Sequence, residues 1–284
     1  MTDHSLLIDC DTLAAHLDDP GWRVLDCRFS LAVPGAGEAA YAEGHVPGAV
    51  FAHLERDLAG PITPQSGRHP LPDPGAFTTR LGAWGIDNDT QVVVYDDASG
   101  AFASRTWWML SHWFGHRRVA LLDGGIEAWI AQGRPLSTTV PKPARCSYTP
   151  HITRAAWTTA DEVRTALDAG GIRLIDARAP DRFRGENEPI DPVSGHVPGA
   201  LNRPFQFNLD ENGHFLPAHM LRAEFEELLA GRSAASAVHM CGSGVTACLN
   251  LLAMEVAGLD GGRLYAGSWS DWIRDASRPV TTDA

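Results

Sequence analysis

The chain carries the same short motifs twice and in the same order, and this repetition limits its possible folds more than any other feature. The recurring pairs are VLDCR at 24–28 with LIDAR at 174–178, GHVPGAV at 44–50 with GHVPGAL at 195–201, and GGIEAW at 124–129 with AGSWSDW at 266–272. The first two pairs are offset by 150 and 151 positions. Three ordered matches at nearly constant spacing predict two copies of one domain, as the length of 284 residues also suggests.

The domain boundaries follow from the segment that separates the two copies. Residues 137–150 read STTVPKPARCSYTP, with three prolines and no long apolar run, which is typical of a linker. We therefore expect a first domain over 1–137, a linker over 138–150 and a second domain over 151–284.

Each copy alternates short apolar runs with longer segments that suit helices. In the first copy the runs at 23–26, 92–95 and 119–122 predict buried parallel strands, and 106–114 and 126–131 predict helices. This alternation indicates an α/β fold in which each domain is an open, mostly parallel sheet flanked by helices. Ligands of such sheets bind beyond the carboxyl ends of the strands.

Cys241 stands at such a position, between a strand-like run at 237–240 and a helix-compatible segment at 247–257. Unpaired amides and the helix dipole at a helix N-terminus stabilise an anion, so a cysteine there is favoured as the reactive thiolate. We interpret Cys241 as a nucleophile. The alternative is a small buried cysteine beside a tight turn.

The residues that follow Cys241 suit an anion-binding loop. Gly242 and Gly244 allow the backbone to curl its amides around the sulfur. Ser243 and Thr246 add hydroxyl donors, and Val245 completes the loop before Ala247. We expect Gly242, Gly244, Val245 and Thr246 to contact the substrate.

The two copies differ at the nucleophile position. The segment 238–241 (VHMC) corresponds to 93–96 (VVYD) in the first copy, so Asp96 stands where the second copy has Cys241. A carboxylate cannot carry a sulfur atom. The first domain is therefore predicted to be an inactive support, and the chain to have one active site.

A thiolate that attacks an anionic substrate needs local positive charge. Arg182 follows a predicted strand of the same domain as Cys241, and Arg184 lies two residues further on. Arginine binds carboxylate-like groups through two parallel hydrogen bonds. Both are candidate substrate-binding residues. The alternative for both is a surface ion pair with Asp181 or Glu186.

Composition excludes several classes of function. The formal net charge is −12 and the pI about 5.4, without a basic run, which argues against a nucleic-acid partner. No apolar stretch approaches the length of a membrane-spanning helix, and no signal peptide is visible at the N-terminus. An odd number of cysteines, five, indicates a reducing, cytoplasmic setting.

The sequence predicts neither a metal ion nor a cofactor. The twelve histidines form no Cys-x2-Cys or His-x3-His grouping. No Gly-x-Gly-x-x-Gly follows a first strand, and no Gly-Lys-Ser/Thr phosphate loop is present. The chemistry would then rest on protein groups alone.

Taken together, the motifs resemble the tandem-domain rhodanese-type sulfurtransferases. The resemblance covers nearly the whole chain and rests on the repeated Asp-x-Arg and Gly-His-Val-Pro-Gly-Ala motifs, the late Gly-Ser-Trp-x-x-Trp motif and the loop Cys-Gly-Ser-Gly-Val-Thr-Ala. That loop is the one associated with 3-mercaptopyruvate sulfurtransferases, whereas thiosulfate-preferring members carry basic residues after the cysteine. The family's inactive first domain commonly has an aspartate at the position of Asp96.

The resemblance implies that Cys241 takes sulfur from 3-mercaptopyruvate as a persulfide and passes it to cyanide, a small thiol or a thioredoxin-like protein. It assigns the substrate carboxylate to Arg182 and a proton-handling role to Ser243. In the family a histidine and an acid from the first domain assist that serine; His69 matches the histidine, and Glu55 stands where the family has an aspartate. The alternative for His69 is an exposed loop residue.

One departure from the family concerns the donor. The interval 186–194 (ENEPIDPVS) lacks the second substrate arginine that mercaptopyruvate enzymes usually have, so either Arg184 or Arg68 would supply that charge. The alternative donor is thiosulfate. A cysteine-dependent phosphatase is disfavoured because its Cys-x5-Arg motif would need arginine near Ala247. A persulfide sensor without turnover is the remaining alternative.

Overall fold

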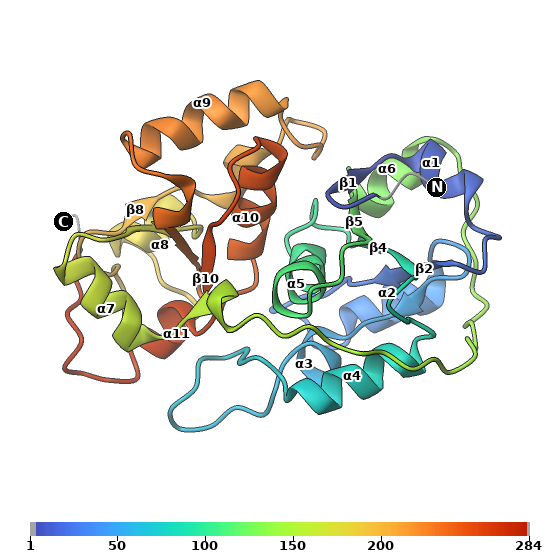
Figure 1. The fold of residues 1–284 in the computed structure, drawn as a ribbon, viewed down its shortest axis with the longest axis horizontal. Coiled ribbons are helices and arrows are strands. Elements are labelled where there is room, and N and C mark those ends of the chain that lie inside the picture. The colour runs from blue at the N-terminus through green and yellow to red at the C-terminus, as the bar shows by residue number, and fades with distance from the viewer. Residues whose placement is uncertain (1–3, 283–284) are drawn as a thin grey trace. The chain divides into compact units, whose positions relative to one another are not determined.

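The computed structural model describes residues 4–282, which fold into two compact units (Figure 1). The first unit comprises residues up to 60, 71–153 and 211–215. The second comprises 61–70, 154–210 and the chain from 216 onward. The short segment 61–70 therefore packs with the unit that contains Cys241, although most of its sequence neighbours belong to the first unit.

The first unit is built on a five-stranded parallel sheet of order β1-β5-β4-β2-β3. Its strands are β1 (Leu7–Ile8), β2 (Trp22–Asp26), β3 (Val50–Phe51), β4 (Gln91–Tyr95) and β5 (Val119–Leu122). Its helices are α1 (Cys10–Ala15), α2 (Ala36–Glu43), α3 (Leu54–Asp57), α4 (Pro74–Ala83), α5 (Ala103–Trp108), a π-helical turn at Met109–Trp113, and α6 (Gly125–Ala131).

The second unit repeats this plan with the order β6-β10-β9-β7-β8, again all parallel. Its strands are β6 (Trp157–Thr158), β7 (Arg173–Asp176), β8 (Leu201–Asn202), β9 (Ala237–Met240) and β10 (Arg263–Tyr265). Its α-helices are α7 (Ala160–Asp168), α8 (Pro180–Arg184), α9 (Ala218–Leu229), α10 (Ala247–Val256) and α11 (Ser268–Trp272), and short 3-10 turns lie at Arg154–Ala156, Phe205–Asn208 and Ala234–Ser236.

Burial on both faces explains why the central strands are continuous apolar runs. All five residues of β4 and all four of β9 are buried, as expected for a parallel sheet covered by helices on both sides. Val93 and Tyr95 of β4 belong to a core that also includes residues of α1 and α6. Val238 and Met240 of β9 share the corresponding core with α7 and α11. The expected α/β class, with an open parallel sheet in each half, is confirmed.

The repeated Asp-x-Arg and Gly-His motifs serve the same structural purpose in both units. Asp26 accepts three hydrogen bonds from Nε and Nη2 of Arg28 at 2.7–3.1 Å, and Arg28 Nη2 also donates to the carbonyl of Gly44. In the second unit Asp176, Arg178 and the carbonyl of Gly195 make the same contacts. This buried ion pair connects the end of β2, and of β7 in the second unit, to the loop that contains the Gly-His motif, so the motif supports the fold.

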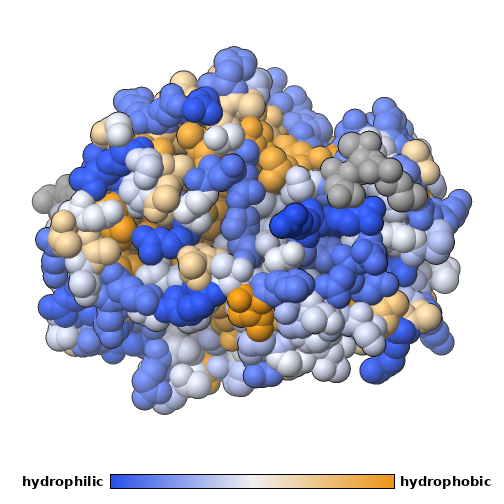
Figure 2. Space-filling model, viewed as in Figure 1, coloured by the Kyte–Doolittle hydropathy of each residue, from blue (hydrophilic) through white to orange (hydrophobic). Residues whose placement is uncertain are grey.

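The segment from 138 to 153 contains neither helix nor strand. It is fixed along the first unit by backbone hydrogen bonds from Cys146 to Gly82 and from His151 to Phe114. Polar residues predominate on the face of the molecule drawn in Figure 2, with apolar residues scattered among them. Within residues 4–282, no helix has the length and apolar character that a membrane crossing requires.

Candidate active site in the second unit

Cys241 is the first residue after β9 and begins the loop that leads into α10. Its side chain is buried, with 2% exposed. Its N–H donates to Ser268 Oγ at 3.0 Å, and its carbonyl accepts from the N–H of Trp269 at 3.0 Å. The carbonyl of Gly242 likewise accepts from the N–H of Ser270. The late Gly-Ser-Trp motif therefore holds the start of the loop in place.

Several backbone amides of this loop are not used in hydrogen bonds to the protein. Within the chain from 4 to 282, the N–H groups of Gly242, Ser243, Val245 and Thr246 have no protein acceptor. Gly244 has a φ of +75°, and a Cβ at this position would lie 2.2 Å from the carbonyl oxygen of Ala266. Only glycine fits there. The loop thus keeps four amide donors available directly after Cys241, as an anion-binding nest requires.

Ser243 and His69 lie together although 174 positions separate them in sequence. His69 Nδ1 and Ser243 Oγ are 2.8 Å apart, and the two side chains are 2% and 5% exposed. The segment 61–70 that carries His69 is fixed to the second unit by a hydrogen bond from the N–H of Arg68 to Ser270 Oγ at 3.0 Å. A buried hydroxyl–imidazole pair can relay a proton at this place.

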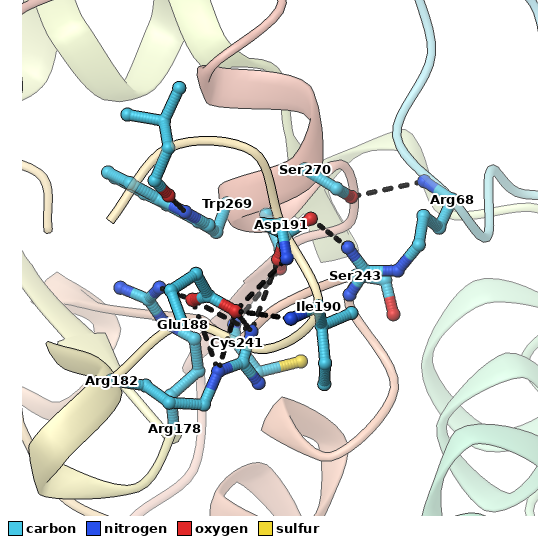
Figure 3. A network of polar contacts seen from close by, with 12 residues as sticks. Arg68, Arg178, Arg182, Glu188, Ile190, Asp191, Cys241, Ser243, Trp269 and Ser270 are labelled. Atoms are coloured by element: carbon cyan, nitrogen blue, oxygen red, sulfur yellow. Dashed lines mark hydrogen bonds and ion pairs between the residues drawn. The ribbon is translucent and has the colours of Figure 1, made fainter. Parts of the chain in front are cut away.

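Arg182, on α8, approaches the same loop. A Cβ added to Gly242 would lie 3.6 Å from Arg182 Nη2 and 2.8 Å from Arg68 Nη2, so both guanidinium groups border the residue next to Cys241. Arg182 donates through Nε and Nη2 to Glu188 at 2.8–3.1 Å and through Nη2 to Asp191 at 3.2 Å. Arg68 Nη1 also bonds to Asp191 (Figure 3).

Glu188 and Asp191 are both nearly buried, but their pKa values are shifted in opposite directions. Burial alone would raise the pKa of Glu188, but hydrogen bonds from Arg182 and from two backbone amides outweigh it, and the pKa lies below its ordinary value. Burial raises the pKa of Asp191, and the Arg68 guanidinium offsets only part of this rise. Sequence patterns did not identify these two carboxylates. The available signal was the acidic character of the arginine-free interval 186–194.

Arg184 pairs with a carboxylate of its own segment. Arg184 Nε and Nη2 bond to Glu186 at 2.7 and 2.8 Å, and its side chain is 42% exposed. This is the surface ion pair considered as the alternative for Arg184. Arg182, by contrast, is paired with neither Asp181 nor Glu186 through its guanidinium. Glu55 belongs to the short helix α3 of the first unit.

The corresponding loop of the first unit is arranged differently. Asp96 follows β4 and is fully buried. Its Oδ1 accepts from the amides of Ala98 and Gly100, and its Oδ2 from those of Phe102 and Ala103, all at 2.8 Å. Burial raises the pKa of Asp96, and the four amide donors oppose that rise. Here the loop encloses its own anion.

In the part of the chain that the structure describes, no three His, Cys, Asp or Glu side chains are grouped as metal ligands would be. The site therefore consists of a cysteine in an open amide nest, a serine–histidine pair and two arginines held by two carboxylates.

A family model described as the rhodanese-like domain matches residues 9–132 and again 159–275. This chain belongs to the rhodanese family. The two matched segments correspond to the two parallel sheets, and the second contains the Cys241 loop.

Among curated relatives, a protein of Pseudomonas aeruginosa named a probable 3-mercaptopyruvate sulfurtransferase is 49% identical over 278 residues, which is 97% of this chain and 98% of the relative. The thiosulfate sulfurtransferase of Bos taurus is 37% identical over 90% of this chain and 86% of its own length. Among solved structures, a 3-mercaptopyruvate sulfotransferase from Escherichia coli aligns with a TM-score of 0.79 and 32% identity, covering 94% of this chain and all of that one.

Proposed function

We propose that this rhodanese-family protein is a sulfurtransferase that moves sulfur from 3-mercaptopyruvate, through a persulfide on Cys241, to a thiophilic acceptor. The observation that carries the proposal is the open amide nest around a buried cysteine, beside a serine–histidine pair and an arginine. The names of the relatives support sulfur transfer as the reaction class.

The residues support a double displacement. The Cys241 thiolate attacks the sulfur of the donor, the carbon–sulfur bond breaks, and its electron pair goes to the pyruvate enolate, which takes a proton to become pyruvate. The amides of Gly242, Ser243, Val245 and Thr246 stabilise the negative charge of the persulfide, for which they are free in the described structure.

Arg182 and the Ser243–His69 pair orient the donor and handle its proton. Arg182 binds the carboxylate of mercaptopyruvate in this proposal, and Arg68 provides the second positive group, because both border Gly242. The buried Ser243 hydroxyl hydrogen-bonds the donor's carbonyl or mercaptan, while His69 accepts or returns a proton through it.

Thiosulfate is the alternative donor, favoured by the name of the bovine relative. The loop residues Gly242 and Ser243 are uncharged, which suits a singly charged carbonyl compound better than a doubly charged inorganic anion. We therefore place mercaptopyruvate first. The first unit, with Asp96 enclosed by its own loop, serves as an inactive support.

The acceptor is a small thiol, a thioredoxin-like protein or, in an assay, cyanide, and the reaction takes place in the cytoplasm. No nucleic acid, membrane, metal ion or cofactor has a role in this proposal. Among residues 4–282 the cysteines are not joined by disulfides, which agrees with a reducing compartment.

A steady-state assay with 3-mercaptopyruvate and thiosulfate side by side, with cyanide as acceptor, tests the proposal. We expect multiple turnovers with both, with the higher kcat/KM for mercaptopyruvate. A single transferred sulfur per chain without turnover would instead identify a persulfide sensor. Transfer from neither donor would refute the proposed function.

A further inference from the structure

Two carboxylates, Glu188 and Asp191, accept hydrogen bonds from the two arginines of the site and leave part of each guanidinium group unbonded. Glu188 contacts the Nε–Nη2 edge of Arg182, and Asp191 bridges Arg182 Nη2 to Arg68 Nη1 (Figure 3). The Glu188 and Asp191 side chains are each 3% exposed. These contacts are therefore part of the interior of the second unit, where electrostatic interactions are stronger than at a surface.

The opposite edges of the two guanidinium groups remain available near the nucleophile loop. Within residues 4–282, Arg182 Nη1 and Arg68 Nη2 have no protein acceptor. They lie 3.7 and 2.8 Å from the position of a Cβ on Gly242. One anionic group placed beside Gly242 would thus meet two N–H donors that the carboxylates have already oriented.

The charges of this group of four residues cancel. Arg68 and Arg182 carry two positive charges, and Glu188 and Asp191 carry two negative ones. The neighbouring pair of Arg178 and Asp176 is balanced in the same way. An anion at Gly242 therefore meets well-placed donors in a group of arginines and carboxylates whose formal charges sum to zero, beside the Cys241 thiolate.

We propose that Glu188 and Asp191 determine the charge selectivity of this anion site, so that it favours donors with one negative charge over donors with two. The inference rests on the proposed function and refines it. A donor with one carboxylate can bind both oriented N–H donors. The second negative charge of a dianionic donor finds no additional cation, and the two buried carboxylates repel it. Glu188 and Asp191 are specificity-determining positioning residues, because they act through Arg182 and Arg68.

The test is to neutralise one carboxylate while keeping its shape. Glu188→Gln and Asp191→Asn each retain an oxygen that accepts from arginine and raise the local charge by one. We expect the ratio of kcat/KM for thiosulfate to that for mercaptopyruvate to rise about fivefold to tenfold, as for one partly screened unit charge nearby. Arg68→Gln lowers the local charge by one, so it should move the same ratio in the opposite direction.

Glu186→Gln is the matched control, because it makes the same chemical change in the same loop on a side chain that pairs with exposed Arg184. It should change the ratio less than about twofold, as expected for an exposed pair. Equal losses with both donors in Glu188→Gln and Asp191→Asn would show that the carboxylates only orient the arginines, and would overturn the charge selectivity.

A binding measurement separates this inference from the proposed function. Titration calorimetry of sulfate and acetate reports the affinities of a dianion and a monoanion without turnover. We expect sulfate to bind more tightly to Glu188→Gln than to the unmodified protein by about fivefold, while acetate affinity changes less. An unchanged ratio of the two affinities refutes the inference even if sulfur transfer is confirmed, and a shifted ratio supports it even if neither donor is turned over.

Discussion

The loops at Asp96 and Cys241 begin at the same point of two similar sheets and differ in what occupies their amides. In the first unit the Asp96 carboxylate accepts from four amides of its own loop. In the second, four loop amides have no acceptor among residues 4–282. The amides of the first loop are hydrogen-bonded by a side chain of the same loop, whereas those of the second remain available to an anionic ligand.

The surrounding framework is the same in both cases, so it does not explain this difference. The carbonyl of Asp96 accepts from the N–H of Ile126 at 3.0 Å, and that of Cys241 accepts from Trp269 at the same distance. The two Asp-x-Arg pairs also make the same bonds between arginine, aspartate and a glycine carbonyl, although Arg178 additionally contacts Glu188. A fold-level scaffold is thus shared, while the chemistry depends on one side chain and its loop.

The largest effect is expected from removing the sulfur atom. Cys241→Ser should abolish transfer, because a serine hydroxyl is not ionised at neutral pH and cannot hold a persulfide. Mass spectrometry after donor treatment should find one added sulfur on the Cys241 peptide of the unmodified protein and none in the variant. Cys146→Ser, at a partly exposed thiol, is the control and should retain activity. Added sulfur on Cys27 or Cys248 instead would contradict the assignment.

The matching change in the first unit should act on stability. Asp96→Ala leaves four loop amides, two of them buried, without their acceptor, so we expect the free energy of unfolding of the first unit to fall by about 3–5 kcal/mol. Urea denaturation, with hydrogen exchange to identify the affected unit, measures this. Asp97→Ala, one residue further on and exposed, is the control. An equal and small effect of both substitutions would mean that the loop does not depend on its internal anion.

Much of this architecture could be predicted from the sequence because the central strands are long buried runs. The runs at 92–95 and 237–240 correspond to β4 and β9, and 247–257 to α10. The edge strands β1, β3, β6 and β8 have two residues each, too few to show a period. The expected helix 106–114 proved to be the end of α5 followed by a π-helical turn. All of α5 is buried, so no amphipathic pattern marks its bounds.

The site could be anticipated only where a local pattern carried the chemistry. The glycines and hydroxyls after Cys241 indicate an anion-binding loop by themselves. The contacts among Arg68, Arg182, Glu188 and Asp191 depend on how two irregular segments, 61–70 and 185–194, fold against α8. Such segments have neither periodicity nor a fixed turn motif, so residue spacing does not reveal which carboxylate meets which arginine.

Arg182→Ala tests whether the second loop needs a cation that the first does not. We expect the KM for mercaptopyruvate to rise by about 10- to 100-fold, as the loss of one charge-assisted contact would cause. Arg182→Lys should recover part of the loss, because an ammonium lacks the planar fork. Arg184→Ala, which breaks an exposed ion pair with Glu186, provides the comparison. Equal KM values for both alanine variants would remove Arg182 from the substrate site.

Ser243 is the residue that tests which sulfur donor the second loop prefers. Its counterpart in the first loop, two residues after Asp96, is Ala98, which has no hydroxyl. Ser243→Ala separates His69 from the reacting atoms. We expect turnover of mercaptopyruvate to fall about 10-fold or somewhat more, toward the low end for a positioned acid–base group. Thiosulfate has no thiol proton, so its turnover should change little. Losses of equal size with the two donors would mean that Ser243 only shapes the loop.

The smallest expected effect is on stability and comes from the N-terminal caps of α1 and α7, the helices that follow the edge strands β1 and β6. Asp9 caps α1 through the N–H of Thr12. In α7, Thr159 and Glu162 form a reciprocal capping box, and Arg154 pairs with Glu162. Hydrogen bonds from Arg154 and from the Thr159 amide lower the pKa of Glu162 to about 2. Hydrogen bonds from Thr12 also lower the pKa of Asp9, so both caps depend on a carboxylate, but only α7 has the reciprocal box with an arginine partner.

The sign of the pH dependence follows from the lowered pKa of Glu162. The ionised Glu162 stabilises the folded state, so its contribution is complete above the ordinary pKa of glutamate and is lost as the pH falls through about 2.

Because half of the side chain is exposed, Glu162→Gln should lower the free energy of unfolding at neutral pH by only about 0.5 kcal/mol. The glutamine oxygen can still accept from Thr159, so only the charge is removed. Hydrogen exchange should place the loss in α7, with α1 unchanged, and the difference between the variant and the unmodified protein should vanish only below about pH 2. A difference that persists there would assign the cap to hydrogen bonding rather than to charge.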